Sequence, residues 1–314
     1  MNKRVIAVFG GGGFLGSNIC DRLLKAGHHV KIFERPRIEP YRNFSKEESV
    51  EWVTGDFSSK HDIDAFIDGV DVVMHLISST LPRGSNDDVI FDVQSNVIST
   101  LNLLNSMVAK GIKKIIFISS GGTVYGKPIY TPLDEEHPTN PMVSYGITKL
   151  AIEKYLLLFQ SLYGIKARIL RVANPYGERQ RVETAQGAVG VFLNKVFRGE
   201  SIEVWGDGSV VRDYIYVGDV ADAFVKAIDY EGEQSVFNIG SGSGKSLNEL
   251  IHAIQEIVGR HVEVNYLPSR SFDVPVSVLD NSLALQELGW APQIEFNEGI
   301  KKTASWMSPY FKNE

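Results

Sequence analysis

The sequence predicts an α/β protein in which a doubly wound parallel sheet carries a smaller C-terminal α/β lobe. Short apolar runs alternate with helical patterns through the first half of the 314-residue chain. Four glycines stand together directly after the first apolar run. Near residue 174 the alternation of apolar runs and helical patterns becomes less regular. Strands that are apolar along their whole length and separated by helices are typical of a parallel sheet covered on both faces.

The predicted strands of the first half are rich in β-branched and aromatic residues, as buried strands are. They are RVIAVF (4–9), HVKIFE (29–34), VDVVMHLI (70–77), KKIIFISS (113–120) and IKARILRVA (165–173). Helical patterns lie between them, at residues 17–27, 61–69, 92–111 and 145–164. Gly164 then ends the last of these helices, as glycine commonly does.

The second half mixes irregular, helical and strand-like segments without an internal repeat. These are a polar stretch at 174–187, a helix at 189–199, a short strand at 201–206, the run VVRDYIYVGDVADAFVKAI at 210–228 and a helix at 247–259. We therefore expect residues 1–173 to form a dinucleotide-binding domain, with returns from about 211–238. Residues 174–314 would form an interleaved substrate-binding lobe.

Composition narrows the class of protein. A formal net charge of -6 argues against nucleic acid as the main partner, because phosphate backbones need a basic surface. The single cysteine, Cys20, allows no internal disulfide, and no run of about 18 apolar residues predicts a membrane span. The seven histidines are scattered, so we expect no metal site. These features favour a cytoplasmic protein that does not bind membranes.

The glycine run VFGGGGFLGS is typical of a phosphate-binding turn. Gly10, Gly13 and Gly16 make a GxxGxxG pattern between a strand and a helix that begins near Phe14 and Leu15. One glycine makes the tight turn, one lets the backbone approach a pyrophosphate, and the last lets the helix pack against the strand. The free N–H groups at the helix start would bind the anion. This layout predicts a Rossmann-type fold.

The acidic residue that ends the next strand selects the dinucleotide. Glu34 lies 18 positions after Gly16, where a carboxylate can accept hydrogen bonds from the ribose hydroxyls of NAD. Arg35 beside it could accept a 2′-phosphate, so NADP stays open as an alternative. The later GSGSGKS (240–246) lacks the first glycine of a phosphate loop, and we expect only a turn that ends at a helix N-cap, Ser246.

Tyr145 and Lys149 are the candidate proton-transfer pair. Their four-residue spacing at the start of a helix puts both side chains on one face, one turn apart. An ammonium group near a phenol favours the phenolate, so the sequence predicts that Lys149 lowers the pKa of Tyr145 towards neutrality. Tyr145 would then act as a general base near pH 7.

Several motifs together resemble one family. They are the GxxGxxG start, Asp56-Phe57, Asn96 in SNVIST, SSGGTVYG at 119–126, the YxxxK pair, RVANPYG at 171–177 and VRDYIYVGDVADA at 211–223. They span essentially the whole chain, which resembles the extended short-chain dehydrogenase/reductase family. Within it, the chain is similar to nucleotide-sugar 4-epimerases related to UDP-galactose 4-epimerase.

The resemblance implies a set of binding residues. Asp56 and Phe57 would border the adenine, and Lys149 would hold the nicotinamide ribose. The remaining cofactor residues that it implies are Leu76, Ile77 and Ser78 along the nicotinamide ribose, with Asn96 and Ser119. The implied substrate residues are Asn174, Val189, Trp205 and Arg212 for the sugar nucleotide, and Arg270 and Asp273 for its nucleotide end.

The chain departs from the family at the position that carries serine or threonine before the VYG segment. Gly121 stands there, so Ser120 or Thr123 is expected to contact the reacting hydroxyl. Relatives that eliminate water or carbon dioxide place an acid at Gly122 or Thr123. No acid stands at either place, which argues against dehydration.

The family also implies a substrate preference. Ser277 matches the place where enzymes restricted to UDP-glucose and UDP-galactose carry a tyrosine, and a small residue there leaves room for an N-acetyl group. The resemblance thus implies a nucleotide-sugar 4-epimerase in which bound NAD transiently oxidises C4. Its expected substrates are UDP-N-acetylglucosamine and UDP-N-acetylgalactosamine, with UDP-glucose and UDP-galactose as further candidates. An NDP-4-ketosugar reductase and a non-catalytic dinucleotide sensor are the alternatives.

Two further expectations rest on analogy with relatives. Helices 92–111 and 145–164 would pair across a homodimer axis, although their apolar faces could equally cover the sheet. Supply of sugar nucleotides for polysaccharide biosynthesis would be the cellular role.

Overall fold

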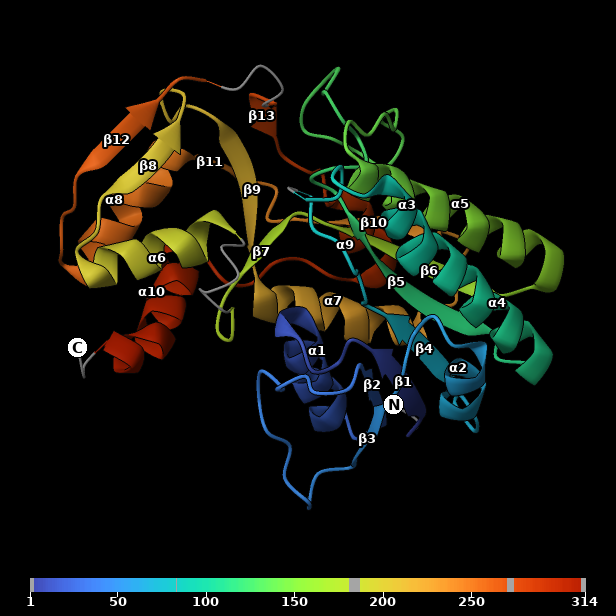
Figure 1. The fold of residues 1–314 in the computed structure, drawn as a ribbon. Coiled ribbons are helices and arrows are strands. Elements are labelled where there is room, and N and C mark those ends of the chain that lie inside the picture. Colours follow the sequence, from blue (N-terminus) through green and yellow to red (C-terminus); the bar gives the residue numbers. More distant parts are fainter. Residues whose placement is uncertain (1–2, 83, 181–186, 270–273, 312–314) are drawn as a thin grey trace.

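The structure is a computed structural model that describes residues 3–311 except 83, 181–186 and 270–273. Figure 1 shows two lobes, a larger one built on a central sheet and a smaller one that carries the C-terminus. The central sheet has seven strands in the order β10-β6-β5-β4-β1-β2-β3, and every pairing in it is parallel. The predicted α/β fold with a doubly wound parallel sheet is confirmed.

The strand order places the ligand-binding edge. The chain winds outward from β1 in one direction through β2 and β3, and then in the other through β4, β5, β6 and β10. In such sheets ligands bind outside the carboxyl ends of the strands, where the winding reverses. The strands are β1 (Val5–Phe9), β2 (His29–Glu34), β3 (Val50–Thr54), β4 (Val72–His75), β5 (Lys114–Ser120), β6 (Lys166–Val172) and β10 (Val236–Ile239).

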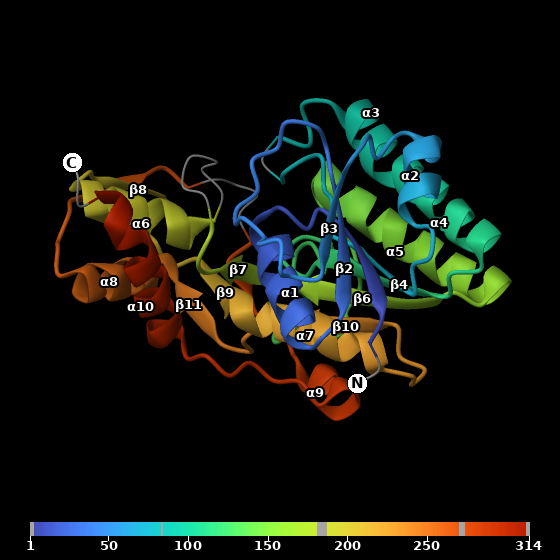
Figure 2. The same cartoon turned by 90° about the horizontal axis from the view of Figure 1, so that it is seen from below.

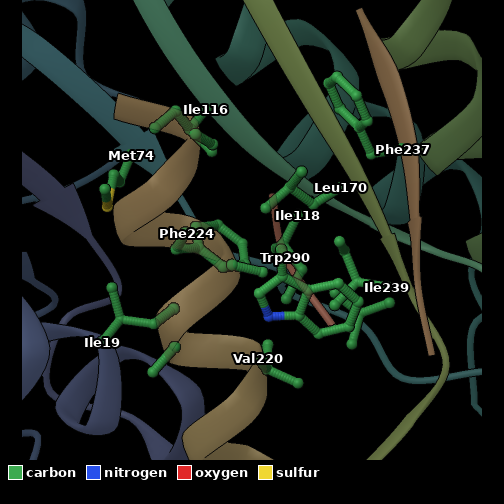
Figure 3. Packing of buried hydrophobic residues seen from close by; sticks show 14 of the residues in the cluster. Ile19, Met74, Ile116, Ile118, Leu170, Val220, Phe224, Phe237, Ile239 and Trp290 are labelled. Atoms are coloured by element: carbon green, nitrogen blue, oxygen red, sulfur yellow. The ribbon is translucent and has the colours of Figure 1, made fainter. Parts of the chain in front are cut away.

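Helices cover both faces of this sheet (Figure 2). One face is covered by α1 (Phe14–Lys25) and α7 (Val217–Asp229), and the other by α2 (Lys60–Phe66), α4 (Ser99–Lys110) and α5 (Ser144–Tyr163). Figure 3 shows Phe224 of α7 and Ile19 of α1 packed with Trp290 and strand residues of the first face. A continuous apolar layer on each side thus fixes the sheet between the helices.

In the part of the chain that the structure describes, the smaller lobe combines two short sheets with three α-helices and one 3-10 helix. One sheet orders β11-β9-β13 with β7 beside β9, and the other pairs β12 with β8. Its elements are β7 (Asn174–Tyr176), α6 (Ala188–Arg198), β8 (Ile202–Trp205), β9 (Val211–Tyr216), β11 (Gly244–Ser246), α8 (Leu247–Val258), β12 (Val264–Leu267), β13 (Val276–Ser277), α10 (Phe296–Met307) and the 3-10 helix η3 (Ser308–Phe311).

The chain crosses between the lobes several times. It returns to the central sheet with α7 and β10, and again with α9 (Ser282–Leu288) and Trp290, which is buried against α7. The segment that leads to α9 passes over the larger lobe, where Leu279 forms a bridge with Leu133. These crossings bring β13 and Leu279 to the edge at which β5 and β6 end.

Beyond residue 259 the sequence prediction named no element, and the structure has β12, β13, α9 and α10 there. In the first half of the chain, local structure differs from the prediction at three places. β3 lies outside the predicted strands, because this edge strand is half-exposed and carries Glu51 among its apolar residues. The expected strand 70–77 ends at His75. The expected helix 92–111 is preceded by a short α3 (Val89–Asp92) and begins with a π-helical turn, η1 (Val93–Ile98), before α4.

Ser246 is the N-cap of α8, as predicted, and its side chain accepts a hydrogen bond from Glu249 N in a capping box. Within the described ranges, no helix has the length and apolar character that crossing a membrane requires.

Candidate active site

The glycine turn between β1 and α1 is held by contacts that exclude side chains. A Cβ on Gly16 would lie 2.0 Å from the carbonyl oxygen of Gly10, and Gly10 itself has a φ of +88°. Gly13, the N-cap of α1, differs: the nearest atom to a Cβ there would be Gly10 O at 3.6 Å. The turn therefore has no room for side chains at Gly10 and Gly16, whereas at Gly13 a ligand can approach the backbone.

The start of α1 can accept an anion. No N-cap side chain bonds to this helix in the described part of the chain, and no acidic residue stands in its first turn. The first N–H groups, from Phe14 and Leu15, therefore keep no partner within the helix. A pyrophosphate placed there would be stabilised by these N–H groups and by the helix dipole. The predicted phosphate-binding turn fits the backbone geometry.

Glu34 lies at the end of β2, beside this turn. Its buried Oε1 accepts a hydrogen bond from Gly12 N at 2.9 Å. Burial raises the pKa of Glu34, whereas that hydrogen bond lowers it. Arg35, by contrast, is exposed. The adjoining Asp56 accepts hydrogen bonds from the N–H and hydroxyl of Ser58, and Phe57 packs against Phe9.

The segment after β4 closes the other side of the turn. Leu76 N donates to Phe9 O at 3.0 Å, and a Cβ on Gly10 would lie 3.3 Å from a side-chain carbon of Ile77. Ser78 is half-buried and donates its hydroxyl to Thr80 O. The structure thus brings the residues predicted to line the nicotinamide ribose against the residues predicted to hold the pyrophosphate.

Tyr145 and Lys149 lie on the first turns of α5. Lys149 Nζ is 5.6 Å from the centre of the Tyr145 ring and 4.7 Å from that of Phe117. The amine is buried and donates to Ile118 O at 3.0 Å. Two groups from the segment between β4 and α3 fix the helix start: Tyr145 N donates to Ser85 Oγ at 3.0 Å, and Ser144 N donates to Asn86 Oδ1 at 2.9 Å.

The prediction that Lys149 lowers the pKa of Tyr145 is wrong for the protein alone. Burial, together with the charge of Asp92, raises the pKa of Tyr145 to about 12, and a hydrogen bond with Ser120 lowers it only in part. Burial also lowers the pKa of Lys149 to about 7, so the amine is only partly charged near neutral pH. Removal of both groups from water therefore outweighs their attraction.

Leu279 explains why glycine stands at position 121, and the hydroxyl groups of Ser120 and Thr123 lie near Tyr145. A Cβ at Gly121 would lie 2.5 Å from Leu279 Cδ1 and 3.1 Å from Arg171 O, so a larger residue there needs Leu279 to move. Ser120 hydrogen-bonds Tyr145. Thr123 Oγ1 is buried and has no hydrogen-bond partner among the residues that the structure describes. Both hydroxyls thus stay candidates for contact with the reacting group.

Two predicted cofactor residues are engaged within the protein. Asn96 accepts from Ser79 N at 2.9 Å and donates to Asp92 Oδ1 at 2.8 Å. Ser119 donates to Glu153, which forms a buried ion pair with Arg171 at 2.7 Å. These contacts hold the surrounding loops and strands in place.

Four predicted substrate residues line one cavity. Asn174, Val189, Trp205 and Arg212 surround a cavity of about 410 Å³ between the small sheet and α6. Arg212 NH1 donates to Val211 O at 2.9 Å and to Val274 O at 2.6 Å. Ser277 is buried and pairs with Arg212 in the register of β13 and β9. Arg270 and Asp273 lie outside the described residues.

The sequence analysis did not single out Asp92, Glu153 or His75. Asp92 and Glu153 are buried acids on helices, where a carboxylate is ordinarily a solvated residue. His75 is buried among aromatic rings, and burial lowers its pKa to about 3, so it is neutral. Among the residues that the structure describes, no three His, Cys, Asp or Glu side chains group as metal ligands do.

The fold and the site define a dinucleotide-dependent enzyme with a tyrosine–lysine pair beside the cofactor turn. A family model described as the NAD dependent epimerase/dehydratase family matches residues 6–240. The chain belongs to this family, and NAD is its cofactor. It is an NAD-dependent epimerase of nucleotide sugars.

Named relatives match along nearly the whole chain. A UDP-glucose 4-epimerase of Mycolicibacterium smegmatis is 36% identical, and the match covers 98% of each chain. A dTDP-4-dehydro-6-deoxyglucose reductase of Escherichia coli is 32% identical over 96% of each.

Solved structures agree with this assignment. The UDP-glucose 4-epimerase of Thermotoga maritima with UDP-glucose has a TM-score of 0.93 at 34% identity, covering 98% of this chain and 100% of that one. The UDP-N-acetylglucosamine 4-epimerase of Methanobrevibacter ruminantium, in complex with UDP-N-acetylmuramic acid, has a TM-score of 0.92 at 29% identity, covering 99% and 100%.

Replacement of two glycines separates folding from cofactor binding. Gly16→Ala forces a Cβ into backbone and should lower the free energy of unfolding by about 3 kcal/mol or more. Gly13→Ala has room for its methyl group and should fold within about 1 kcal/mol of the wild type, yet retain roughly tenfold less NAD after dialysis. Urea unfolding and the NAD content per chain measure both effects. Full NAD retention by Gly13→Ala would mean that the pyrophosphate does not lie on this turn.

Proposed function

We propose that this protein interconverts UDP-N-acetylglucosamine and UDP-N-acetylgalactosamine and also accepts UDP-glucose and UDP-galactose. The observation that carries the choice of N-acetylated sugars is the small, buried Ser277, which pairs with the cavity residue Arg212 and lies two residues before Leu279, the neighbour of Gly121. The relatives named as UDP-glucose and UDP-N-acetylglucosamine 4-epimerases support the reaction type and the uridine diphosphate.

The position of Ser277 follows from the strand that carries it. Ser277 pairs with Arg212 at the cavity, and Leu279, two residues on, lies against Gly121 beside Ser120. Ser277 and Leu279 are both buried, whereas Val276 is exposed and Val278 half-exposed, so Ser277 and Leu279 share the inner face of an extended segment. The sugar of a substrate that reaches from Arg212 to Tyr145 passes this face, where serine leaves space for an acetamido group.

The chain's own groups perform the proton transfers. Tyr145 takes the proton of the C4 hydroxyl and returns it to the oxygen of the 4-keto sugar, while Ser120 or Thr123 hydrogen-bonds that oxygen. Arg212 holds the diphosphate, so the flat 4-keto sugar can turn over within the pocket without leaving it. Bound NAD supplies the hydride acceptor and donor at C4 and a positively charged ring, and a positive charge near a phenol lowers its pKa.

Lys149 contributes a positive charge close to the Tyr145 ring. Its protonated form favours the phenolate, and Ile118 O and the Phe117 ring hold the amine in place. Glu34 and the N–H groups at the start of α1 would hold the adenosine ribose and pyrophosphate of NAD.

A product assay without added nicotinamide tests the reaction and its base together. The purified protein should convert UDP-N-acetylglucosamine to UDP-N-acetylgalactosamine with the NAD it retains. Tyr145→Phe should lower kcat at least 10³-fold, because the group that moves the proton is lost, while its NAD content stays that of the wild type. Chromatographic separation of the two sugar nucleotides measures turnover. Wild-type rates in Tyr145→Phe would remove Tyr145 as the base.

The substrate preference has its own test. Ser277→Tyr should reduce kcat/KM for UDP-N-acetylglucosamine roughly 100-fold and leave UDP-glucose within about threefold, because the phenol fills the space of the acetamido group. Ser277→Ala is the matched control and should keep both substrates. An equal loss of the two substrates in Ser277→Tyr would contradict the steric role of this position.

A second candidate function has two observations in its favour. The Escherichia coli relative is named a dTDP-4-dehydro-6-deoxyglucose reductase, and the exposed Arg35 could face a 2′-phosphate. Under this alternative the protein is silent with UDP-N-acetylglucosamine alone and oxidises added NADPH in the presence of an NDP-4-ketosugar.

We further propose that the protein is a homodimer. Apolar side chains stand exposed on one surface formed by α3, η1 and α5, which contact one another. They are Val89, Ile90, Phe91, Val93, Ile98, Ile147, Tyr155, Leu158 and Leu162. On α5 their spacing keeps them on one helix face, and a second copy of the same surface would cover them.

Charge substitutions on this surface test the dimer. Ile90→Asp with Leu158→Asp should halve the mass found by light scattering, because the buried interface would then have to take up two carboxylates. Leu285→Asp, on the exposed side of α9, should leave the mass of the dimer unchanged. A wild-type mass of one chain at micromolar concentration would contradict the proposal.

A further inference from the structure

Asp92 lies where three parts of the candidate active site meet. It ends α3, directly before the π-helical turn η1, and its side chain is fully buried. Its Oδ2 accepts from Ser144 Oγ at 2.5 Å and from Thr148 Oγ1 at 3.4 Å. These two donors directly precede Tyr145 and Lys149 in the first turns of α5. The carboxylate therefore fixes the helix start that presents the proton-transfer pair.

The second oxygen of Asp92 faces the loop after β4. Oδ1 accepts from Thr80 Oγ1 at 2.5 Å and from Asn96 Nδ2 at 2.8 Å. Asn96 in turn accepts from Ser79 N at 2.9 Å. One carboxylate thus ties α5 to the segment that follows Leu76, Ile77 and Ser78, which the resemblance assigns to the cofactor.

The hydrogen-bond donors around Asp92 are all neutral. In the part of the chain that the structure describes, no lysine or arginine nitrogen lies within ion-pair distance of this carboxylate. A buried charge without a paired cation acts strongly on its neighbours, because little water screens it. The charge of Asp92 raises the pKa of both Tyr145 and Lys149.

The other ionisable groups near the pair act on it differently. Glu153, one turn after Lys149 on α5, raises the pKa of Lys149 but is itself paired with Arg171 at 2.7 Å. His75 of β4 is neutral, because burial and the charge of Lys149 lower its pKa. Among these groups, Asp92 is the one whose charge acts on Tyr145 as well as on Lys149.

We propose that Asp92 is a positioning residue for the proton-transfer pair: its carboxylate ties the start of α5 to the loop after β4, and its charge sets the pH range in which Tyr145 and Lys149 exchange protons. This inference rests on the proposed roles of those two residues. It adds a fully buried carboxylate that acts through the neighbours to which it is hydrogen-bonded.

The pH profile of Asp92→Asn tests the charge separately from the packing. Removal of a negative charge lowers the pKa of Tyr145 and of Lys149, so both limbs of the bell-shaped profile of kcat should move to lower pH, by about one unit. Ser144→Ala keeps the charge and loses one hydrogen bond, so it should lower kcat without moving either limb. Asp219→Asn replaces another buried acid, one that accepts from Ile294 N, and should leave both limbs in place.

A spectroscopic readout keeps this test independent of turnover. The ¹³C shift of the hydroxyl-bearing ring carbon of Tyr145, assigned through Tyr145→Phe in labelled holoenzyme, should titrate at lower pH in Asp92→Asn than in the wild type. If Tyr145→Phe were active, the proposed base would fail while this titration still reported on Asp92. An unchanged Tyr145 titration, or a loss of rate at every pH without movement of the limbs, would overturn the proposal.

Discussion

A lysine amine buried beneath a tyrosine ring is unfavourable in itself, and the contacts around Lys149 and Tyr145 are arranged to compensate. The amine donates to Ile118 O, lies over the Phe117 ring and is approached by the charges of Glu153 and Asp92. Burial still brings its pKa down to about 7. Lys149 is thereby kept close to a change of protonation near neutral pH, whereas the phenolate of Tyr145, whose pKa burial raises to about 12, needs added positive charge beside it.

The two lobes supply complementary parts of one site. The larger lobe brings the glycine turn, the segment after β4 and α5 to the edge where the winding of the sheet reverses. The smaller lobe contributes the cavity lined by Arg212, and its strand β13 leads to Leu279, which lies against Gly121. Because the chain passes between the lobes several times, the distance between the cavity and the proton-transfer pair is fixed by packed strands rather than by a loose linker.

Much of this arrangement could be predicted from local sequence signals. The glycine spacing, the apolar strands and the four-residue offset of Tyr145 and Lys149 each have a direct structural meaning. Other features depend on contacts between distant segments. The raised pKa of Tyr145 depends on tertiary burial. In the sequence, Asp92 resembles any other acidic residue on a helix, and only the fold shows that Ser144 and Thr80 both donate hydrogen bonds to it. Likewise, glycine is favoured at position 121 because Leu279, which lies far along the chain, fills the space of a side chain there. The sequence did not predict β3, because an edge strand tolerates a charged residue such as Glu51.

The central claim is that the Tyr145 oxygen and the glycine turn serve the same reacting centre. A crystal structure with NAD and UDP-N-acetylglucosamine bound tests it most directly. The account predicts the pyrophosphate on the first N–H groups of α1 and the Tyr145 hydroxyl within about 3 Å of the sugar's C4 oxygen. A pyrophosphate bound elsewhere, or a C4 oxygen beyond hydrogen-bond reach of Tyr145, would contradict it.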